Sequence, residues 1–95
     1  MSAYIIVQIT VNDEAAYARY REDVPETIKK FGGEYIVRGG DMELLEGEWR
    51  MPRCVVLRFP DMASARAWYN SPDYQGPKAV RQAAAVSNAI LIEGV

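Results

Sequence analysis

The stretch that decides the fold is residues 3–31, which read AYIIVQITVNDEAAYARYREDVPETIKKF. Its first nine residues place apolar side chains at alternate positions, which predicts a strand over residues 3–11 with one wholly apolar face and one mixed face. Asn12 or Asp13 then supplies an N-cap, and apolar or aromatic side chains recur at steps of three and four up to about Lys30. These are Tyr17, Tyr20, Val24, Ile28 and Phe31. Such a stripe predicts a helix packed on the strand.

Pro25 lies inside this helical pattern. Because proline has no N–H to donate and clashes with the preceding turn, it predicts a kink, or a restart of the helix with Pro25 in a first turn. Lys29 and Lys30 bring positive charge to the negative end of the helix dipole, and Gly32-Gly33 then ends the helix.

The remaining residues predict three more strands and two more helical segments. The strands are expected over residues 34–38, 53–59 and 87–93. Gly39-Gly40-Asp41 predicts a tight turn, and residues 42–46 a short extension of the same hairpin. One helix is expected from its cap at Asp61 to about Asn70, and another over residues 74–85, after the break at Ser71-Pro72.

The order of these elements is strand, helix, strand, strand, helix, strand. Residues 12–20 (NDEAAYARY) and 61–69 (DMASARAWY) also align with each other, which indicates two similar halves. The sequence therefore predicts an α+β fold: a ferredoxin-like βαββαβ sandwich with a four-stranded antiparallel sheet and helices on one face. At 95 residues, with 49% hydrophobic and 25% charged side chains, we expect a single domain over residues 1–95.

Composition excludes several classes of function. The net charge is −2 and there is no basic run, so we expect no nucleic-acid partner. The longest apolar runs are far shorter than the roughly 20 residues of a membrane span, so we expect no membrane partner. Lone Cys54 fits a small buried side chain and a cytoplasmic location. Because histidine is absent and cysteine occurs once, we expect no histidine-ligated haem and no Cys/His zinc site. Asp41, Glu43 and Glu46 offer carboxylates for a metal ion, but we expect a solvated rim there and no metal site.

The sheet face that the helices do not cover is expected to be apolar. If the helices cover the side that carries Ile5 and Leu57, the opposite side still carries six residues: Tyr4, Ile6, Ile36, Cys54, Val56 and Leu91. A large exposed apolar face marks an interaction surface, and a second copy of the same sheet is the simplest cover. We therefore predict a homodimer through the open sheet face.

The chain also resembles a known family. The resemblance covers nearly the whole chain, and its most specific parts are Arg38-Gly39-Gly40, Glu46-Gly47 with Trp49, and residues 59–74. In these parts the sequence is similar to the small bacterial domain of unknown function thirteen-thirty, within the dimeric α+β barrel superfamily. The resemblance implies two sheets packed into a barrel and no assigned reaction. Cousins include cofactor-free quinol monooxygenases, lactone isomerases, haem-degrading oxygenases and chlorite dismutases, of which the last two usually need a histidine that this chain lacks.

Four polar positions are expected on the dimer face: Gln8, Arg38, Arg58 and Glu93. Two guanidiniums in an apolar cavity match a carboxylate, a phosphate or an enolate, so Arg38 and Arg58 are candidates for binding a small organic acid. The alternative is that both arginines pair with Glu34, Glu43 or Glu93 and only set the dimer register.

Aromatic residues near the helix break form a second set of candidates. Trp68, Tyr69 and Tyr74 flank Ser71-Pro72, where an interrupted helix favours a pocket. Tyr69 or Tyr74 is a candidate proton donor, and the alternative for all three is core packing. Trp49, in a loop, is a candidate for lining or gating an opening, against packing at the dimer rim.

Two functional hypotheses follow from these candidates. In the first, the protein turns over a small carboxylate or phenolic metabolite without a cofactor, with Arg38 and Arg58 orienting the substrate and Tyr69 or Tyr74 donating a proton. In the second, it is a non-catalytic dimeric domain that binds a ligand or a partner. A third possibility is a purely structural dimer, which would not respond to small molecules.

Overall fold

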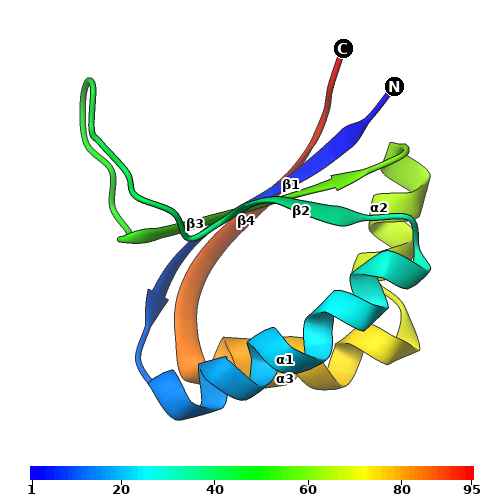
Figure 1. The fold of residues 1–95 in the computed structure, drawn as a ribbon, viewed down its shortest axis with the longest axis horizontal. Coiled ribbons are helices and arrows are strands. Elements are labelled where there is room, and N and C mark those ends of the chain that lie inside the picture. The colour runs from blue at the N-terminus through cyan, green and yellow to red at the C-terminus, as the bar shows by residue number, and fades with distance from the viewer.

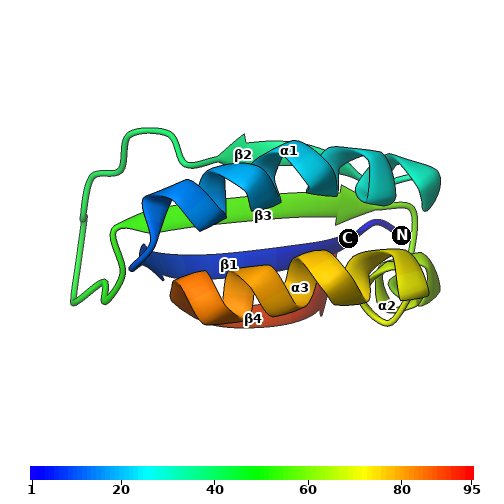
Figure 2. The same ribbon diagram turned by 90° about the horizontal axis from the view of Figure 1, so that it is seen from below.

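Four strands form one antiparallel sheet in the order β2-β3-β1-β4. The computed structural model describes residues 1–95 and confirms the ferredoxin-like α+β fold. Its elements are β1 (Ala3–Val11), α1 (Glu14–Lys30), β2 (Glu34–Arg38), β3 (Arg53–Phe59), α2 (Met62–Tyr69), α3 (Pro72–Ala84) and β4 (Ala85–Glu93). Figures 1 and 2 show α1 and α3 side by side across one face of the sheet, with α2 at one end.

Helix α1 begins as the sequence predicts and continues past its proline. The Asp13 side chain caps it by accepting a hydrogen bond from the Ala16 N–H at 3.1 Å. The helix then runs unbroken for 17 residues through Pro25, so the expected restart does not occur. Proline removes only the one hydrogen bond that its own N–H would make to the carbonyl of Arg21, and that carbonyl has another donor, described below.

The second half repeats this pattern with a divided helix. The Asp61 side chain accepts from the Ser64 N–H at 2.7 Å and caps α2. Helix α3 begins at Pro72, two residues before the predicted start, because proline at the first helical position loses no hydrogen bond and its φ already suits a helix. Helix α3 gives way directly to β4 at Ala85, so this strand also starts two residues earlier than expected.

The tight turn expected at Gly39-Gly40-Asp41, with residues 42–46 as an extension of its hairpin, is wrong, although β2 and β3 do pair antiparallel. Gly39 has a positive φ of 72° and its N–H still bonds the carbonyl of Cys54 at 2.9 Å, but the chain does not turn back there. Residues 39–52 instead leave the sheet as a long arm without a strand at 42–46 (Figure 1). The apolar side chains of the arm do not pack against a strand of the sheet, and Met42, Leu44 and Leu45 are exposed.

The core fills the space between the sheet and the helices. Trp68 lies at its centre at 2% exposure, and its indole N–H donates to the Thr27 hydroxyl at 2.9 Å. The rings of Phe59 and Tyr74 lie 5.5 and 4.0 Å from the Trp68 ring, measured between centroids. This aromatic cluster joins β3, α2 and α3 to α1. Burying such large side chains supplies most of the stabilisation of a small domain.

Strand register decides which side chains face the helices. Ile5 lies opposite Leu57 on β3 and opposite Leu91 on β4, so all three share the helix-covered face. The expectation that Leu91 lies on the open face is therefore wrong, because alternation along β4 depends on its pairing with β1, which a single strand does not reveal.

The uncovered face is strongly apolar. Ile6 lies between Val56 and Ile90 in adjacent strands, and Cys54 lies opposite Gln8. Several of the side chains on this side are exposed, among them Val86, Ile90 and Ile92. No helix in the chain has the length and apolar character needed to cross a membrane.

Candidate functional site

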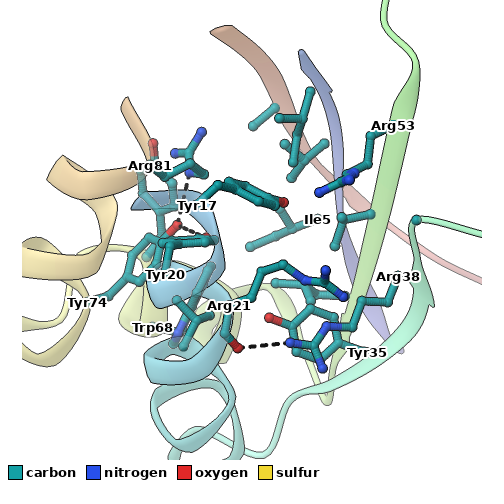
Figure 3. A pocket seen from close by; sticks show the side chains of 18 residues that line it. Ile5, Tyr17, Tyr20, Arg21, Tyr35, Arg38, Arg53, Trp68, Tyr74 and Arg81 are labelled. Atoms are coloured by element: carbon teal, nitrogen blue, oxygen red, sulfur yellow. Dashed lines mark hydrogen bonds between the residues drawn. The ribbon is translucent and has the colours of Figure 1, made fainter. Parts of the chain in front are cut away.

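A cavity of about 80 Å³ lies between the helices and the covered face of the sheet (Figure 3). One buried water needs roughly 10–15 Å³, so a small organic molecule is a better match for this space. Eighteen residues line the cavity, thirteen of them hydrophobic. The charged side chains among them are all arginines, namely Arg21, Arg38, Arg53 and Arg81, and no carboxylate lines the cavity.

Arg21, Arg38 and Arg53 are exposed or half-buried, and they surround the more open part of the cavity, which we call the mouth. Arg38 ends β2 and Arg53 begins β3, so the departure of the arm leaves both at the same end of the sheet. The Arg38 guanidinium carbon lies 4.4 Å from the ring centroid of Tyr35, and that of Arg53 lies 5.1 Å from the ring centroid of Tyr17. Stacking on aromatic rings holds a guanidinium in place while leaving its N–H edge free to bind an anion.

Arg38 has a second anchor, which depends on Pro25. Its Nη2 donates a hydrogen bond to the main-chain carbonyl of Arg21 at 2.9 Å, drawn as a dashed line in Figure 3. In an α-helix this carbonyl would accept from the N–H four residues later, which is position 25. Because Pro25 has no N–H, the carbonyl is free to accept from Arg38. The proline inside α1 therefore positions an arginine at the mouth.

Arg81 lies at the closed end of the cavity and is only 5% exposed. Its Nε donates to the Tyr74 hydroxyl at 3.4 Å, and its Nη1 donates to the Ser87 hydroxyl. The Tyr74 hydroxyl also lies 2.8 Å from that of Tyr20. The two ion pairs of the chain, Lys30–Asp73 and Arg58–Glu34, lie elsewhere, so Arg81 has no carboxylate partner.

The ionisation of these groups is set mainly by burial. Burial, and then the neighbouring Tyr74 phenol, raises the pKa of Tyr20 far above its ordinary value of 10.0. Burial also raises the pKa of Tyr35, against an opposing effect of Arg38. Burial disfavours the charged form of Arg81, but the phenol oxygens of Tyr74 and Tyr20 offset this and leave the pKa of Arg81 above its ordinary value. At neutral pH Arg81 is thus a cation, and Tyr20 is a hydrogen-bonding phenol.

Tyr17 adds a hydroxyl group to the cavity wall. Its side chain is only 3% exposed, and its hydroxyl makes no hydrogen bond within the chain. Every fully buried side-chain oxygen and nitrogen does have a partner, so the Tyr17 oxygen must open onto the cavity. In Figure 3 the Tyr17 side chain lies between Arg81 and Arg53.

Four of the residues singled out in the sequence line this cavity: Arg38, Trp68, Tyr69 and Tyr74. Trp68 and Tyr74 also belong to the hydrophobic core, so these two residues pack in the core as well as line the cavity. Tyr69, the last residue of α2, lines the cavity, and the Lys78 ammonium lies 4.4 Å from the centroid of its ring.

The other four candidates lie elsewhere. Gln8 and Arg58 are on the open face. Arg58 forms an ion pair with Glu34 there, which is one of the pairings expected if this arginine has a structural role. Glu93 lies opposite Ala3, on the helix-covered side, rather than on the open face. Trp49 lies on the arm and is 47% exposed.

Arg38 and Arg58 do not converge, which corrects the expected placement. A β-bulge between Tyr35 and Val37 shifts the alternation of β2 by one residue, so Arg38 faces the helices opposite Val55. Arg58 lies opposite Tyr4 on the other face of the sheet. A bulge leaves no clear mark in five residues of sequence, so the parity of Arg38 could not be derived from the alternation.

Sequence reasoning missed the partners that Arg38 actually has. Tyr17 and Tyr20 appear in the sequence only as members of an apolar helical stripe, and Arg21 and Arg53 carry no signal that places them at a site. Arg81 is the exception, because it follows Tyr74 by seven residues, or two helical turns, and so shares a helix face with it. No three histidine, cysteine or carboxylate side chains cluster closely enough to hold a metal ion.

Solved structures with the same fold cover nearly the whole chain. A protein of unknown function from Rhodopseudomonas palustris is 19% identical with a TM-score of 0.79, and the match covers 99% of this chain and 82% of that one. A dimeric ferredoxin-like protein of unknown function from Jannaschia sp. CCS1 is 16% identical with a TM-score of 0.69, over 99% and 100% of the two chains. The cofactor-independent oxygenase SnoaB from Streptomyces nogalater is 15% identical with a TM-score of 0.61, over 99% and 93%. At these identities the likeness shows the fold alone.

A comparison with curated proteins finds no match to this sequence. A match to a family does exist, and it extends over residues 2–95, which include every strand, every helix, the arm and all four arginines of the cavity. With that extent of agreement, the chain belongs to the family described as Domain of unknown function (DUF1330).

Proposed function

We propose that the cavity between the helices and the sheet binds a small organic anion, a carboxylate or a phenolate, without a bound cofactor. The observation that supports this is the charge of its lining, which has four arginines and no carboxylate in a chain whose net charge is −2. Guanidinium groups bind carboxylates through two parallel hydrogen bonds. Apolar walls exclude water and strengthen such contacts.

Turnover of the bound anion is the further step of this proposal. Arg38 would orient the ligand, and Tyr74, whose hydroxyl bonds both Tyr20 and Arg81, would supply a proton. The alternative is binding without chemistry. The two are separated by following the ligand itself, by chromatography, after incubation with the protein in air.

Binding is tested by thermal unfolding with a panel of small carboxylates and phenols. A ligand at 100 times its Kd stabilises the fold by about 2.7 kcal/mol, and each kcal/mol raises the Tm of a domain this size by roughly 4–8 °C. We expect a clear rise with at least one acid for the wild type, and its loss in Arg53→Gln.

The matched control for this test is Arg19→Gln. Arg19 is exposed on α1, two residues before Arg21, and does not line the cavity. This variant changes the net charge as Arg53→Gln does, and should keep the full ligand response. Equal losses in both variants would mean that the anion responds to net charge rather than to the cavity, and the proposal would be wrong.

We also propose that the open face of the sheet is covered by a second copy of the chain. Its apolar side chains, with Ile90 at 56% exposure, are left without a covering layer, and the molecule measures only 17 Å across its thinnest direction. The dimeric relative from Jannaschia has the same fold, which supports this assembly. Packing two such faces removes a large apolar area from water.

The assembly is tested by sedimentation velocity. We expect a dimer for the wild type and a monomer for Ile90→Glu, because the new carboxylate would be buried without a partner at the interface. Val80→Glu is the control, since Val80 is exposed on α3 and lies away from the open face. A wild type that sediments as a monomer at every concentration rules out the dimer.

A further inference from the structure

The closed end of the cavity is lined by hydrogen-bond donors that lack protein acceptors. Arg81 has five N–H groups, and the structure uses one from Nε for Tyr74 and one from Nη1 for Ser87. Its Nη2 bonds no protein atom. Because no fully enclosed side-chain nitrogen is left without a partner, Nη2 keeps some accessible surface, and Arg81 lines the cavity.

The tyrosine pair beside Arg81 leaves another donor unused. The Tyr20 and Tyr74 hydroxyls share one hydrogen bond of 2.8 Å, so one of their two protons lies between the oxygens. The other proton has no acceptor in the chain. Tyr17, whose ring stacks on that of Tyr20 at 5.6 Å between centroids, brings a third hydroxyl without a protein partner.

A buried cation surrounded by donors calls for an oxygen acceptor. Burying a guanidinium without an anionic partner costs free energy, and leaving its N–H groups unpaired adds to that cost. No carboxylate and no side-chain amide lines the cavity, so the protein itself does not supply the acceptor. The mouth presents a separate set of cations, Arg38 and Arg53, which stack on Tyr35 and Tyr17.

We propose that the ligand carries two oxygen functions separated by an apolar body: a carboxylate held at the mouth by Arg38 and Arg53, and a carbonyl or phenol oxygen held at the closed end by Arg81. Hydroxyaryl and oxo carboxylic acids form this class. The inference rests on the proposed anion site and narrows it, because a simple apolar carboxylate satisfies only the mouth. The apolar side chains between the two ends, such as Val7 and Val55, contact the body of the ligand.

The test compares ligands that differ only at the second oxygen. Isothermal titration calorimetry of the wild type uses benzoate, 4-methylbenzoate, and 3- and 4-hydroxybenzoate. We expect one hydroxybenzoate to bind at least about tenfold more tightly than 4-methylbenzoate, as expected when a ligand oxygen pairs buried polar groups. In Arg81→Met this preference should fall to about twofold or less, whereas Arg53→Gln should weaken every ligand by a similar factor and leave the preference intact.

Tyr17→Phe is a second variant, in case Arg81→Met does not fold. It removes one hydroxyl from the cavity wall and no protein hydrogen bond, and it keeps the aromatic ring on which Arg53 stacks. The ratio of hydroxybenzoate affinity to 4-methylbenzoate affinity should therefore fall severalfold. Far-UV circular dichroism and urea unfolding establish that each variant is folded.

The outcomes separate this inference from the proposal on which it rests. If none of the four carboxylates binds the wild type, the anion site itself is absent from this cavity. If all four bind with equal affinity, the anion site stands and the second oxygen subsite is wrong. The subsite is also wrong if the preference survives in folded Arg81→Met.

Discussion

At the scale of single residues, Gly33 shows how closely α1 approaches the sheet. A Cβ atom at this position would lie 2.5 Å from Phe59 Cε1 and 2.8 Å from Ile28 Cγ2. Both neighbours are core side chains at 1% exposure, so neither can move aside freely. Gly33→Ala should therefore lower the free energy of unfolding by about 1–3 kcal/mol, the usual cost of overpacking, as measured by urea denaturation.

Gly76 provides the opposite case within the same chain. It lies inside α3, and a Cβ atom there would meet nothing within 4 Å. Gly76→Ala should raise the free energy of unfolding by roughly 0.5–1 kcal/mol, because alanine loses less backbone entropy in a helix than glycine. Equal changes in the two variants would show that contact with Phe59 and Ile28 is not what excludes a side chain at Gly33.

Tyr20 gives the fold a dependence on alkaline pH. Burial raises its pKa in the folded state, so the folded protein holds this proton more tightly than the unfolded chain, in which the pKa is near 10.0. The stabilisation is complete below pH 10 and is lost progressively as the pH rises above it. The urea concentration at the unfolding midpoint of the wild type should decrease as the pH is raised from 9.5 to about 11, where the unfolded chain begins to lose this proton.

Tyr20→Phe isolates the contribution of Tyr20. The variant loses the hydrogen bond to Tyr74, which costs about 1 kcal/mol at neutral pH, but its midpoint should fall less steeply above pH 10. Tyr35 also has a raised pKa and stays in both proteins, so some alkaline slope persists. An identical slope in the two proteins would assign the alkaline loss to other groups.

At the scale of elements, Pro25 links the stability of α1 to the geometry of the mouth. Pro25→Ala restores an N–H that competes with Arg38 for the Arg21 carbonyl. The free energy of unfolding should rise by about 2 kcal/mol, since an interior proline costs about 3 and its stiffening of the unfolded chain offsets about 0.4–1. The affinity for a carboxylate bound at the mouth should fall severalfold, as measured by calorimetry with benzoate.

These two effects have opposite signs, which makes the prediction specific. Glu26→Ala is the control, because this neighbouring α1 side chain does not line the cavity. A more stable Pro25→Ala protein with unchanged affinity would show that Arg38 does not need the Arg21 carbonyl to reach its position.

Most elements could be predicted from the sequence because their signals are local. The stripe from Tyr17 to Ile28, the caps Asp13 and Asp61, and the alternation in β1 each depend on residues within one or two turns. The arm was mistaken for a hairpin, because Gly39 and Gly40 permit a tight turn but do not require one.

At the scale of the whole molecule, only part of the site could be predicted, because the site depends on how the elements pack together. Tyr69 and Tyr74 could be singled out by their place beside a helix break. Arg38 was identified but assigned to the wrong face, since the bulge in β2 is set by its pairing with β3. Arg53 and Arg81 come together only in the folded chain, where β3 and α3 enclose the same cavity.

The arm should be the first part of the molecule that a protease cuts. Arg50 lies in it, outside any helix or strand, and is exposed, whereas exposed basic residues such as Arg19 are protected within helices. Brief digestion with trypsin should therefore give fragments 1–50 and 51–95 before any others, as read by mass spectrometry. A first cut inside α1 would contradict this prediction, because it would show that α1 unfolds locally more readily than the protease binds the arm.

The grouping of Arg21, Arg38 and Arg53 at the mouth, with Arg81 behind them, also has a kinetic consequence. The rest of the surface carries a net negative charge and repels a small anion, so the field of the protein guides such an ion toward the mouth before any contact forms. The encounter should be faster than random collision in dilute buffer. It should slow as ionic strength rises and the screening length shrinks toward about 8 Å. In this way the arrangement of a few positive charges sets how quickly an acid finds the cavity, independently of how tightly it is held there.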